Sequence, residues 1–280
     1  MNADVFFCVG KSHSICQDYA ESGKDFVVLA DGCSSAKDSH IGAVLLTRAM
    51  ANWMLYKDPA IQVLSSAKYA AEDLHLPDSA LYATLGSIQV VGDQFEVSLH
   101  GDGVIAARRR RHSAFDRRAW EIISWEYPSG APYYLAYELD TEARRQYLQK
   151  FGNLVKEIHY TQYIAKEQEA NWGRLGQTTT WECPPGPLSR QYSRAAYDAI
   201  AIMSDGVLSF QKTIANSTSI QTEKVPLLSV LTEVLAFKNY SGQFVQRRCK
   251  ACFKKFSEEG ITHIDDFSIG VVYDEGVCQG

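Results

Sequence analysis

The sequence predicts an α+β fold, in which blocks of strands and blocks of helices alternate along one chain. Helix-like segments gather at residues 39–74 and 226–259, whereas residues 80–125 read as a succession of short β-rich runs. Segregated blocks favour antiparallel sheets covered by helices over a doubly wound parallel sheet. With 280 residues, 46% of them hydrophobic, the chain can bury a large core.

The first elements expected are two strands and two helices. The strands lie near residues 5–9 and 26–30, and the first helix covers residues 39–55. Asp58 suits the N-cap of a second helix and Pro59 suits its first turn. An apolar stripe at helical spacing continues this second helix through Ile61, Leu64, Ala67, Ala71 and Leu74.

A meander of antiparallel strands is expected next. Its strands are residues 82–91, 94–99, 104–109 and 120–125, and the Gly92-Asp93 step between the first two is a hairpin signal.

The second half of the chain mixes both kinds of element. A helix over residues 141–151 ends at Gly152, a suitable C′ residue. The remaining expected elements are strands near 157–163, 177–182 and 200–203, helices near 226–237 and 243–259, and a last strand over 267–272. Residues 173–177, 184–187 and 211–223 are expected to be loops. No internal repeat or linker divides the chain, so a single domain over residues 1–280 is predicted.

Cys249 and Cys252 form a CxxC pair, which could be half of a zinc site or a redox centre. No second CxxC accompanies it. On the helix 243–259 both cysteines share one face with Val245, Phe253 and Phe256, so we interpret them as buried thiols.

Charge and cysteine content bound the partners and the compartment. The formal net charge of −5 argues against general nucleic-acid binding. The first ten residues lack a leader-like pattern, and no stretch is apolar over the roughly 20 residues that a membrane helix needs. Seven cysteines, an odd number, indicate reduced thiols. A soluble cytoplasmic protein without membrane insertion is expected, and the sequence does not specify its oligomeric state.

One basic cluster stands out against this acidic background. Its members are Arg108, Arg109, Arg110, Arg111, His112, Arg117 and Arg118. Alternating strand geometry would point neighbouring arginines to opposite sides. A solvated hairpin is therefore expected in preference to a docking surface for acidic or phosphorylated segments.

Carboxylates recur where apolar strand-like runs end or begin. Asp31-Gly32, Asp102-Gly103 and Asp205-Gly206 follow such runs, and Asp265-Asp266 opens the last one. A single Asp-Gly step is an ordinary turn. Several in one domain predict converging carboxylates, which need cations among them if they are to stay ionised. Hard oxygen ligands favour magnesium or manganese over zinc or copper.

The order and content of these junctions resemble the metal-dependent protein phosphatases, the type 2C serine/threonine phosphatase family, in its bacterial-type branch. The matching segments are residues 10–18 (GKSHSICQD), 27–32 (VVLADG), 99–103 (LHGDG), 203–207 (MSDGV) and 265–272 (DDFSIGVV). Each motif is weak alone, but together they follow the family order across nearly the whole chain.

The resemblance implies an α-β-β-α sandwich of two antiparallel sheets flanked by helices, with two Mg²⁺ or Mn²⁺ ions at one end of the sheets. Asp31 would bridge the ions, and the Gly32 carbonyl, Asp205 and Asp265 would add ligands. Asp18 would support the site directly or through water. Asp102 matches a position of a third, weaker metal site, although the Gly-Asp-Gly step could simply shape a turn.

By the same resemblance, the reaction is hydrolysis of phosphoserine or phosphothreonine in a protein substrate. Paired divalent ions activate a shared water for in-line attack, and Asp18 could orient this nucleophile as a catalytic group. Variable, substrate-facing insertions are expected within residues 104–195.

The chain departs from the common family pattern at two places. His13 stands where many members carry a phosphate-gripping Arg, and imidazole lacks the fixed charge and fork of guanidinium. His13 is a candidate for phosphate binding or proton transfer, against a structural hydrogen bond, and Lys11 is a weaker candidate for phosphate attraction. Asp266 replaces the usual Asn, adding charge or stabilising the loop.

These departures leave two alternatives open. The chain could be a non-catalytic, phosphatase-like signalling or binding module, or it could hydrolyse small phosphate esters with the same metals and another pocket.

Overall fold

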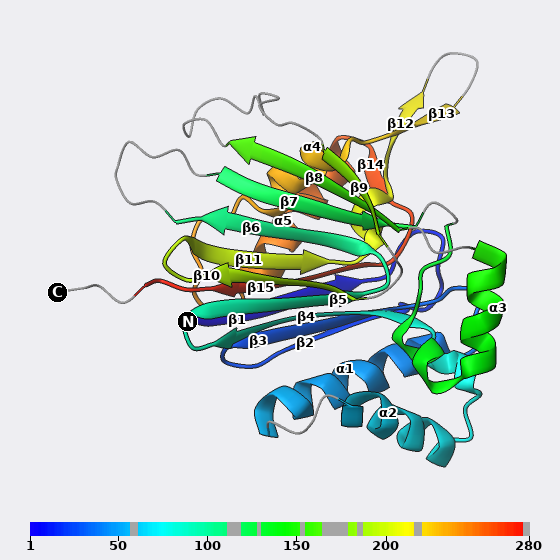
Figure 1. The fold of residues 1–280 in the computed structure, drawn as a ribbon. Coiled ribbons are helices and arrows are strands. Elements are labelled where there is room, and N and C mark those ends of the chain that lie inside the picture. Colours follow the sequence, from blue (N-terminus) through cyan, green and yellow to red (C-terminus); the bar gives the residue numbers. More distant parts are fainter. Residues whose placement is uncertain are drawn as a thin grey trace.

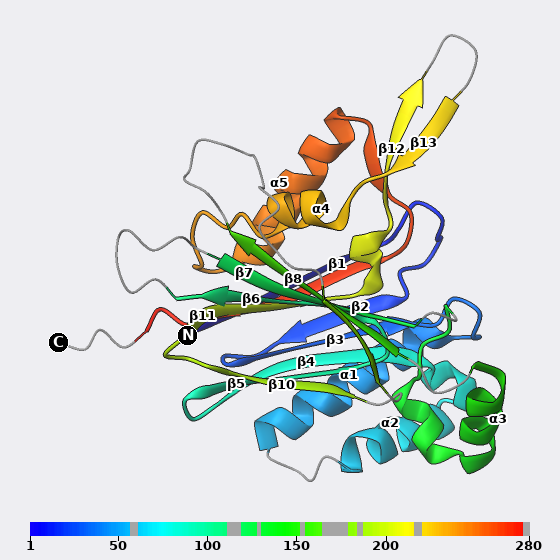
Figure 2. The same ribbon diagram turned by 45° about the horizontal axis from the view of Figure 1, so that its top comes forward.

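Two antiparallel sheets packed face to face form the centre of the computed structural model (Figure 1). The structure describes residues 1–56, 61–110, 119–127, 130–151, 155–163, 179–183, 187–215 and 220–276. Helices cover the outer faces of both sheets (Figures 1 and 2), which confirms the predicted sandwich. No helix among the described residues is long and apolar enough to cross a membrane.

The larger sheet has seven strands. In spatial order they are β1 (Asn2–Cys8), β15 (Phe267–Tyr273), β11 (Tyr197–Met203), β6 (Gly103–Arg109), β7 (Ala119–Glu126), β8 (Val155–Tyr163) and β9 (Thr179–Cys183). The smaller sheet has five strands. Their order is β10 (Leu188–Ser193), β5 (Gln94–His100), β4 (Ala83–Val91), β3 (Phe26–Gly32) and β2 (Asp18–Ser22).

A third, small sheet lies outside the sandwich. Its strands are β13 (Ile220–Lys224), β12 (Phe210–Ala215) and β14 (Ile261–His263). The β12–β13 pair projects away from the body of the molecule (Figure 2).

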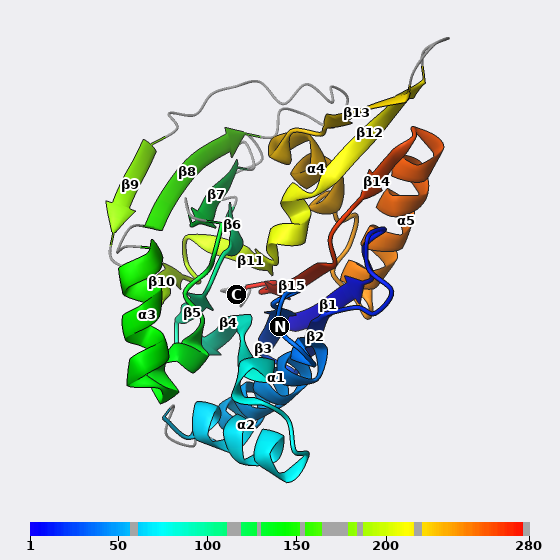
Figure 3. The ribbon, with the colours of Figure 1, turned by 90° about the vertical axis from the view of Figure 1, so that its right-hand side faces the viewer.

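The helices form the two outer layers. Helices α1 (Ser39–Tyr56) and α2 (Ile61–Asp73) lie on the five-stranded sheet, and α4 (Leu227–Val234) and α5 (Phe244–Glu258) lie on the seven-stranded sheet. Helix α3 (Thr141–Phe151) stands at one end of the sheets, the end that faces the viewer in Figure 3. Three short 3₁₀ helices are η1 (Asp78–Leu81), η2 (Leu135–Leu139) and η3 (Asp205–Leu208).

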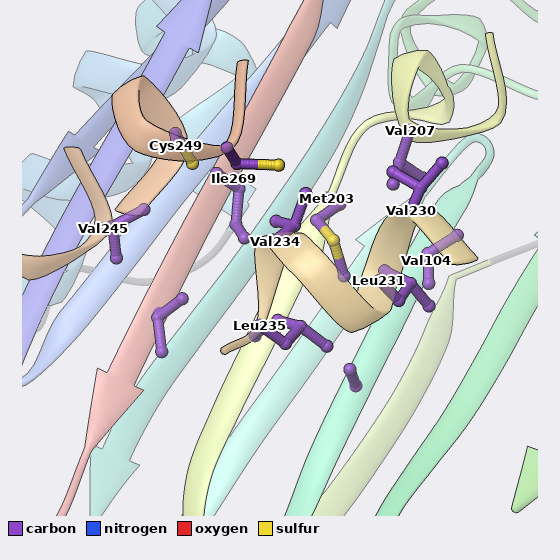
Figure 4. Close-up of a cluster of buried hydrophobic side chains, with 14 of the residues drawn as sticks. Val104, Met203, Val207, Val230, Leu231, Val234, Leu235, Val245, Cys249 and Ile269 are labelled. Carbon is purple, nitrogen blue, oxygen red and sulfur yellow. The ribbon is translucent and has the colours of Figure 1, made fainter. Parts of the chain in front are cut away.

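Three apolar clusters hold the layers together, one between the sheets and one under each helical layer. The cluster beneath α4 and α5 includes Met203 and Val234, and Figure 4 shows Cys249 within it. Cys249 and Cys252 are both buried and free, as predicted for thiols on the apolar face of this helix.

Several strands differ from the expectation. β2, β10 and β14 were not predicted, and the loop expected over residues 211–223 contains β12 and β13 instead. This hairpin lies outside both apolar layers. Lys212, Thr213 and residues 221–224 are exposed and carry no alternating apolar pattern that would predict a strand. The last helix but one is also shorter than expected, ending at Val234. Gly152, the helix start at Asp58-Pro59 and the loop prediction for 173–177 lie outside the described residues, as do residues 184–186 of another predicted loop.

Arg108 and Arg110 correct the prediction of a solvated hairpin, whereas the Arg109 side chain is 61% exposed. Arg108 is buried and pairs with Asp198 at 2.6 Å, and its guanidinium lies 4.7 Å from the centre of the Tyr240 ring. Arg109 pairs with Glu121, and Arg110 pairs with Asp274. Because β6 is an inner strand, carboxylates from neighbouring segments reach these side chains. The cluster members at 111, 112, 117 and 118 lie outside the described residues.

Candidate metal centre

Asp18 and Asp31 face each other across neighbouring strands at one end of the five-stranded sheet. Asp18 opens β2, Asp31 is the last residue but one of β3, and the two are directly paired in the ladder. Directly opposite residues place their side chains on the same face about 5 Å apart. On the other side of β3, Thr84 of β4 is the partner of Asp31.

Gly32 is tightly enclosed behind Asp31. A Cβ atom at this position would lie 2.8 Å from the Ser39 carbonyl oxygen, and the Gly32 N–H donates to the Gln17 carbonyl at 3.1 Å. Only glycine therefore fits without displacing backbone, which explains the Asp-Gly step physically.

Asp205 reaches the same place from the other sheet. It follows β11 and opens η3, and a Cβ at Gly206 would lie 1.7 Å from the Asp266 carbonyl oxygen. The residue before Asp205 joins the two sheets, because Ser204 Oγ donates to Asp18 Oδ2 at 2.7 Å. In turn, the Ser268 N–H of β15 donates to Ser204 Oγ at 2.9 Å.

Asp102 is held beside this group by Thr84, whose Oγ1 donates to Asp102 Oδ1 at 3.0 Å. The flanking Gly101 and Gly103 have φ values of +94° and +146°, so the turn from β5 to β6 requires glycine on both sides of Asp102. The Gly-Asp-Gly step therefore shapes a turn, and through Thr84 it also holds Asp102 near Asp31.

The four carboxyl groups strongly affect one another. Burial and then the charge of Asp205 raise the pKa of Asp102 to about 8, and burial raises the pKa of Asp18 to about 7. Burial also raises the pKa values of Asp31 and Asp205, with further upward contributions at Asp31 from its acidic neighbours. The cluster is therefore unfavourable when fully ionised and without cations.

One carboxylate oxygen of the cluster has no hydrogen-bond donor. Asp18 Oδ1 is buried and has no hydrogen-bond partner. A buried carboxylate oxygen without a donor suits a cation, and the all-oxygen donor set suits a hard divalent ion. Among the described residues, no group of three or more His, Cys, Asp or Glu side chains is already placed so that it could hold a metal ion.

Asp265 stands at the edge of this cluster with a side chain that is 48% exposed. Its charge adds to the raised pKa values of both Asp102 and Asp205. Its own backbone N–H donates to Ser209 Oγ at 3.2 Å, which fixes the start of the last strand.

Asp266 anchors the N-terminal segment that carries His13. The buried Asp266 carboxylate accepts the Gly10 N–H at 2.6 Å and the Gln17 N–H at 2.5 Å. His13 Nδ1 lies 3.0 Å from Asp266 Oδ2, and His13 Nε2 lies 3.6 Å from Asp265 Oδ1. The Asp266 carboxylate is the main cause of the raised pKa of His13. Asp266 therefore both stabilises the loop and adds charge.

Lys11 lies elsewhere. It is exposed and lines a cavity beside α5 together with Phe253 and His263. The structure thus brings Asp18, Asp31, Asp102, Asp205 and Asp265 together with His13 at the edge, and it leaves the Lys11 side chain facing a separate hollow.

Sequence reasoning missed three residues that contact or approach the acids. Ser204 could have been found from its place just before Asp205, whereas only strand register brings Thr84 to Asp102. Tyr134 directly precedes η2, and its side chain is buried. Burial raises the pKa of Tyr134, with smaller upward contributions from Cys33, Asp102 and Asp31.

Comparisons with known proteins agree with this architecture. The family model described as protein phosphatase 2C matches residues 10–243, and no curated protein matches the chain. Among solved structures, the S. agalactiae serine/threonine phosphatase is 14% identical with a TM-score of 0.51, covering 98% of this chain and 99% of that one.

A bacterial serine phosphatase bearing an arginine-to-lysine mutation is 12% identical with a TM-score of 0.54, and the alignment covers 99% of each chain. A bacterial serine phosphatase without a stated mutation is 10% identical with a TM-score of 0.52 and the same coverage. At these identities the structural matches support the fold alone. The family model supports the enzyme class that the motifs predict. The match over residues 10–243 shows that the chain belongs to the protein phosphatase 2C family.

Proposed function

We propose that this protein hydrolyses phosphoserine or phosphothreonine in protein substrates, using two Mg²⁺ or Mn²⁺ ions and one catalytic domain over residues 1–280. The observation that carries the proposal is the cluster of Asp18, which is buried, with the half-buried Asp31, Asp102 and Asp205, whose pKa values are all raised. Such a cluster is costly to the apoprotein and is relieved by divalent cations.

The metal ligands we propose follow the order of the cluster. Asp31, at its centre, would contact both ions, and the Gly32 carbonyl, Asp205 and Asp265 would complete their protein ligands. Asp102, held by Thr84, would serve a third site together with Asp205. When bound, divalent ions of this kind activate water near neutral pH and offset charge on phosphoryl oxygens.

Asp18 is proposed to orient the attacking water. Its Oδ2 is held by Ser204, while its buried Oδ1 has no partner and is free to accept a hydrogen bond. This arrangement fixes one oxygen structurally and leaves the other for the reaction.

His13 is proposed to contact the substrate phosphate or to transfer a proton to the leaving oxygen. Its Nδ1 lies 3.0 Å from Asp266 Oδ2, and its Nε2 lies 3.6 Å from Asp265 Oδ1, at the edge of the acidic cluster. Imidazole does not reproduce the bidentate grip of Arg, so we expect weaker phosphate binding than an arginine would provide.

We further propose that the protein acts in the cytoplasm, in a signalling role. Cys8, Cys16, Cys33, Cys249 and Cys252 are free, in keeping with a reducing compartment.

Turnover of phosphopeptides with Mn²⁺ tests the proposal. Wild-type protein should release phosphate, Asp31→Asn and Asp205→Asn should lose at least about 100-fold in kcat/KM, and the exposed Asp73→Asn should match the wild type. Calorimetry should show weaker Mn²⁺ binding by both site variants.

The same assay separates the alternatives. Better kcat/KM for small phosphate esters than for any phosphopeptide would favour a metabolite phosphatase. Mn²⁺ binding without turnover of either substrate class would favour a non-catalytic signalling module.

A further inference from the structure

A cavity of about 260 Å³ lies between α5, β14 and the segment that precedes His13. Its walls are mainly apolar and aromatic, with Phe210, Phe253, Phe256 and Ile261 among the lining residues. Phe210 packs edge-on against Phe256 with ring centres 5.4 Å apart, so the aromatic wall is firmly packed. Lys11 and His263 also line the cavity, and Lys11 is exposed.

Two paired segments connect this cavity to the candidate metal centre. The Lys11 N–H donates to the His263 carbonyl at 3.1 Å, and the Ser12 N–H donates to the Ile264 carbonyl at 3.0 Å. Two residues beyond Lys11 and His263 are His13 and Asp265, which border the acidic cluster. Two residues of chain span at most about 7 Å, so a bound peptide could reach both places within a few residues.

We propose that this cavity is a specificity subsite that takes one aromatic or branched aliphatic side chain of the phosphoprotein substrate, a few residues from the phosphorylated position. The inference rests on the proposed function, because it names the kind of sequence that the phosphatase prefers. The aromatic walls offer apolar surface to such a side chain. The exposed positive charge of Lys11 at the cavity edge disfavours a basic residue there and suits an acidic or phosphorylated segment.

The test uses phosphopeptides that differ at one position. A phosphoserine peptide is scanned with Leu, Phe, Ala or Lys at each of the three positions on either side, and kcat/KM is measured with Mn²⁺. We expect one position at which Leu or Phe exceeds Ala by about 10-fold, with Lys below Ala. Equal rates for all four residues at every position would overturn the inference.

Two variants tie the preference to this cavity. Ser257 lines the cavity on the exposed side of α5, so Ser257→Trp should fill it and reduce the apolar preference to less than twofold. The neighbouring Glu258 is exposed and does not line the cavity, so Glu258→Trp is the matched control and should keep the preference. Val9→Asn, at another lining residue that is 46% exposed, should weaken the preference without the bulk of Trp.

Two further readouts separate this inference from the proposed function. Hydrolysis of p-nitrophenyl phosphate, which has no flanking residues, should be unchanged in Ser257→Trp and Val9→Asn. If no substrate is hydrolysed, the proposed function fails, and fluorescence anisotropy with the same peptides still tests the subsite. Turnover with a preference that survives Ser257→Trp and Val9→Asn would leave the phosphatase proposal standing and reject the subsite.

Discussion

Ser204, which directly follows β11 of the seven-stranded sheet, hydrogen-bonds Asp18 of the five-stranded sheet, with Ser204 Oγ 2.7 Å from Asp18 Oδ2. This contact joins the two layers at the place where the carboxylates meet. It also opposes the effect of burial, because the Ser204 hydroxyl lowers the pKa of Asp18 while burial raises it.

Ser204→Ala should therefore weaken metal binding. Without the hydroxyl, the Asp18 carboxylate is harder to ionise, and we expect the Kd for Mn²⁺ to rise roughly 10-fold, as is typical when a residue supporting a metal site is removed. Isothermal titration calorimetry measures this change. Ser229→Ala, on the exposed side of α4, should leave the affinity as it is; an equal effect in both variants would contradict the role of Ser204.

His13 and Asp266 should act as a coupled pair. We expect His13→Ala to lower kcat/KM for a phosphopeptide at least about 10-fold, and to do so less in an Asp266→Asn background, where the ring has lost its charged partner. A double-mutant cycle on kcat/KM should give a coupling of about 1 kcal/mol. Additive effects would show that Asp266 does not position His13.

Asp266→Asn also disturbs the backbone contacts of Gly10 and Gln17. For this reason kcat/KM should be compared only under conditions in which circular dichroism shows the same folded fraction for the wild type and all three variants.

The acidic cluster predicts an unusual pH dependence for the apoprotein. Asp102 has a folded-state pKa of about 8, above its ordinary value of about 4 in an unfolded chain. The folded state then binds more protons than the unfolded state between these values, so the stability that Asp102 contributes is complete below about pH 4 and is lost as the pH rises toward 8.

In EDTA, Asp102→Asn should consequently gain stability relative to the wild type as the pH rises from 5 to 8. We expect a relative gain of roughly 1–3 kcal/mol in the free energy of unfolding, measured by urea denaturation at each pH. Saturating Mn²⁺ should stabilise the wild type more at pH 8 than at pH 5. A difference between wild type and variant that does not change with pH would contradict the mutual repulsion described for this cluster.

Gly206→Ala should be severely destabilising, because its Cβ would lie 1.7 Å from the Asp266 carbonyl oxygen. Backbone must move to relieve such a contact, and we expect a loss of at least about 3 kcal/mol in thermal or chemical unfolding. Gly92→Ala is a matched comparison at a position with φ of +58° and no atom within 4 Å of the new Cβ. It should cost only about 1 kcal/mol, from backbone strain alone.

The positions of Asp31, Asp102, Asp205 and Asp265 were predictable because each lies where an apolar strand ends or begins, a local pattern that one sequence displays. Asp18 begins β2, which was not predicted, and only the family resemblance identified it. Thr84 gave no such signal, since only the register between β3 and β4 brings it opposite Asp31. Arg108 was misjudged for a related reason. A run of arginines looks solvated in sequence, whereas the pairing of β6 with β11 brings it to the Asp198 carboxylate.

The His13–Asp266 contact likewise joins residues far apart in the chain. Each residue was recognisable as a departure from the family pattern, but their contact was not, because it depends on the N-terminal segment folding back onto the last strand. Exposed elements such as the β12–β13 hairpin were missed because nothing in the core dictates their residues.

The division of the carboxylates between the two sheets has a consequence for assembly of the molecule. Asp18 and Asp31 belong to the five-stranded sheet, and Asp205 adjoins the seven-stranded one. Neither sheet alone carries the whole set, so a partly folded chain with only one sheet formed has no complete site. Divalent ions would thus link the two sheets, and they would bind only once the sheets have packed together at the end of folding.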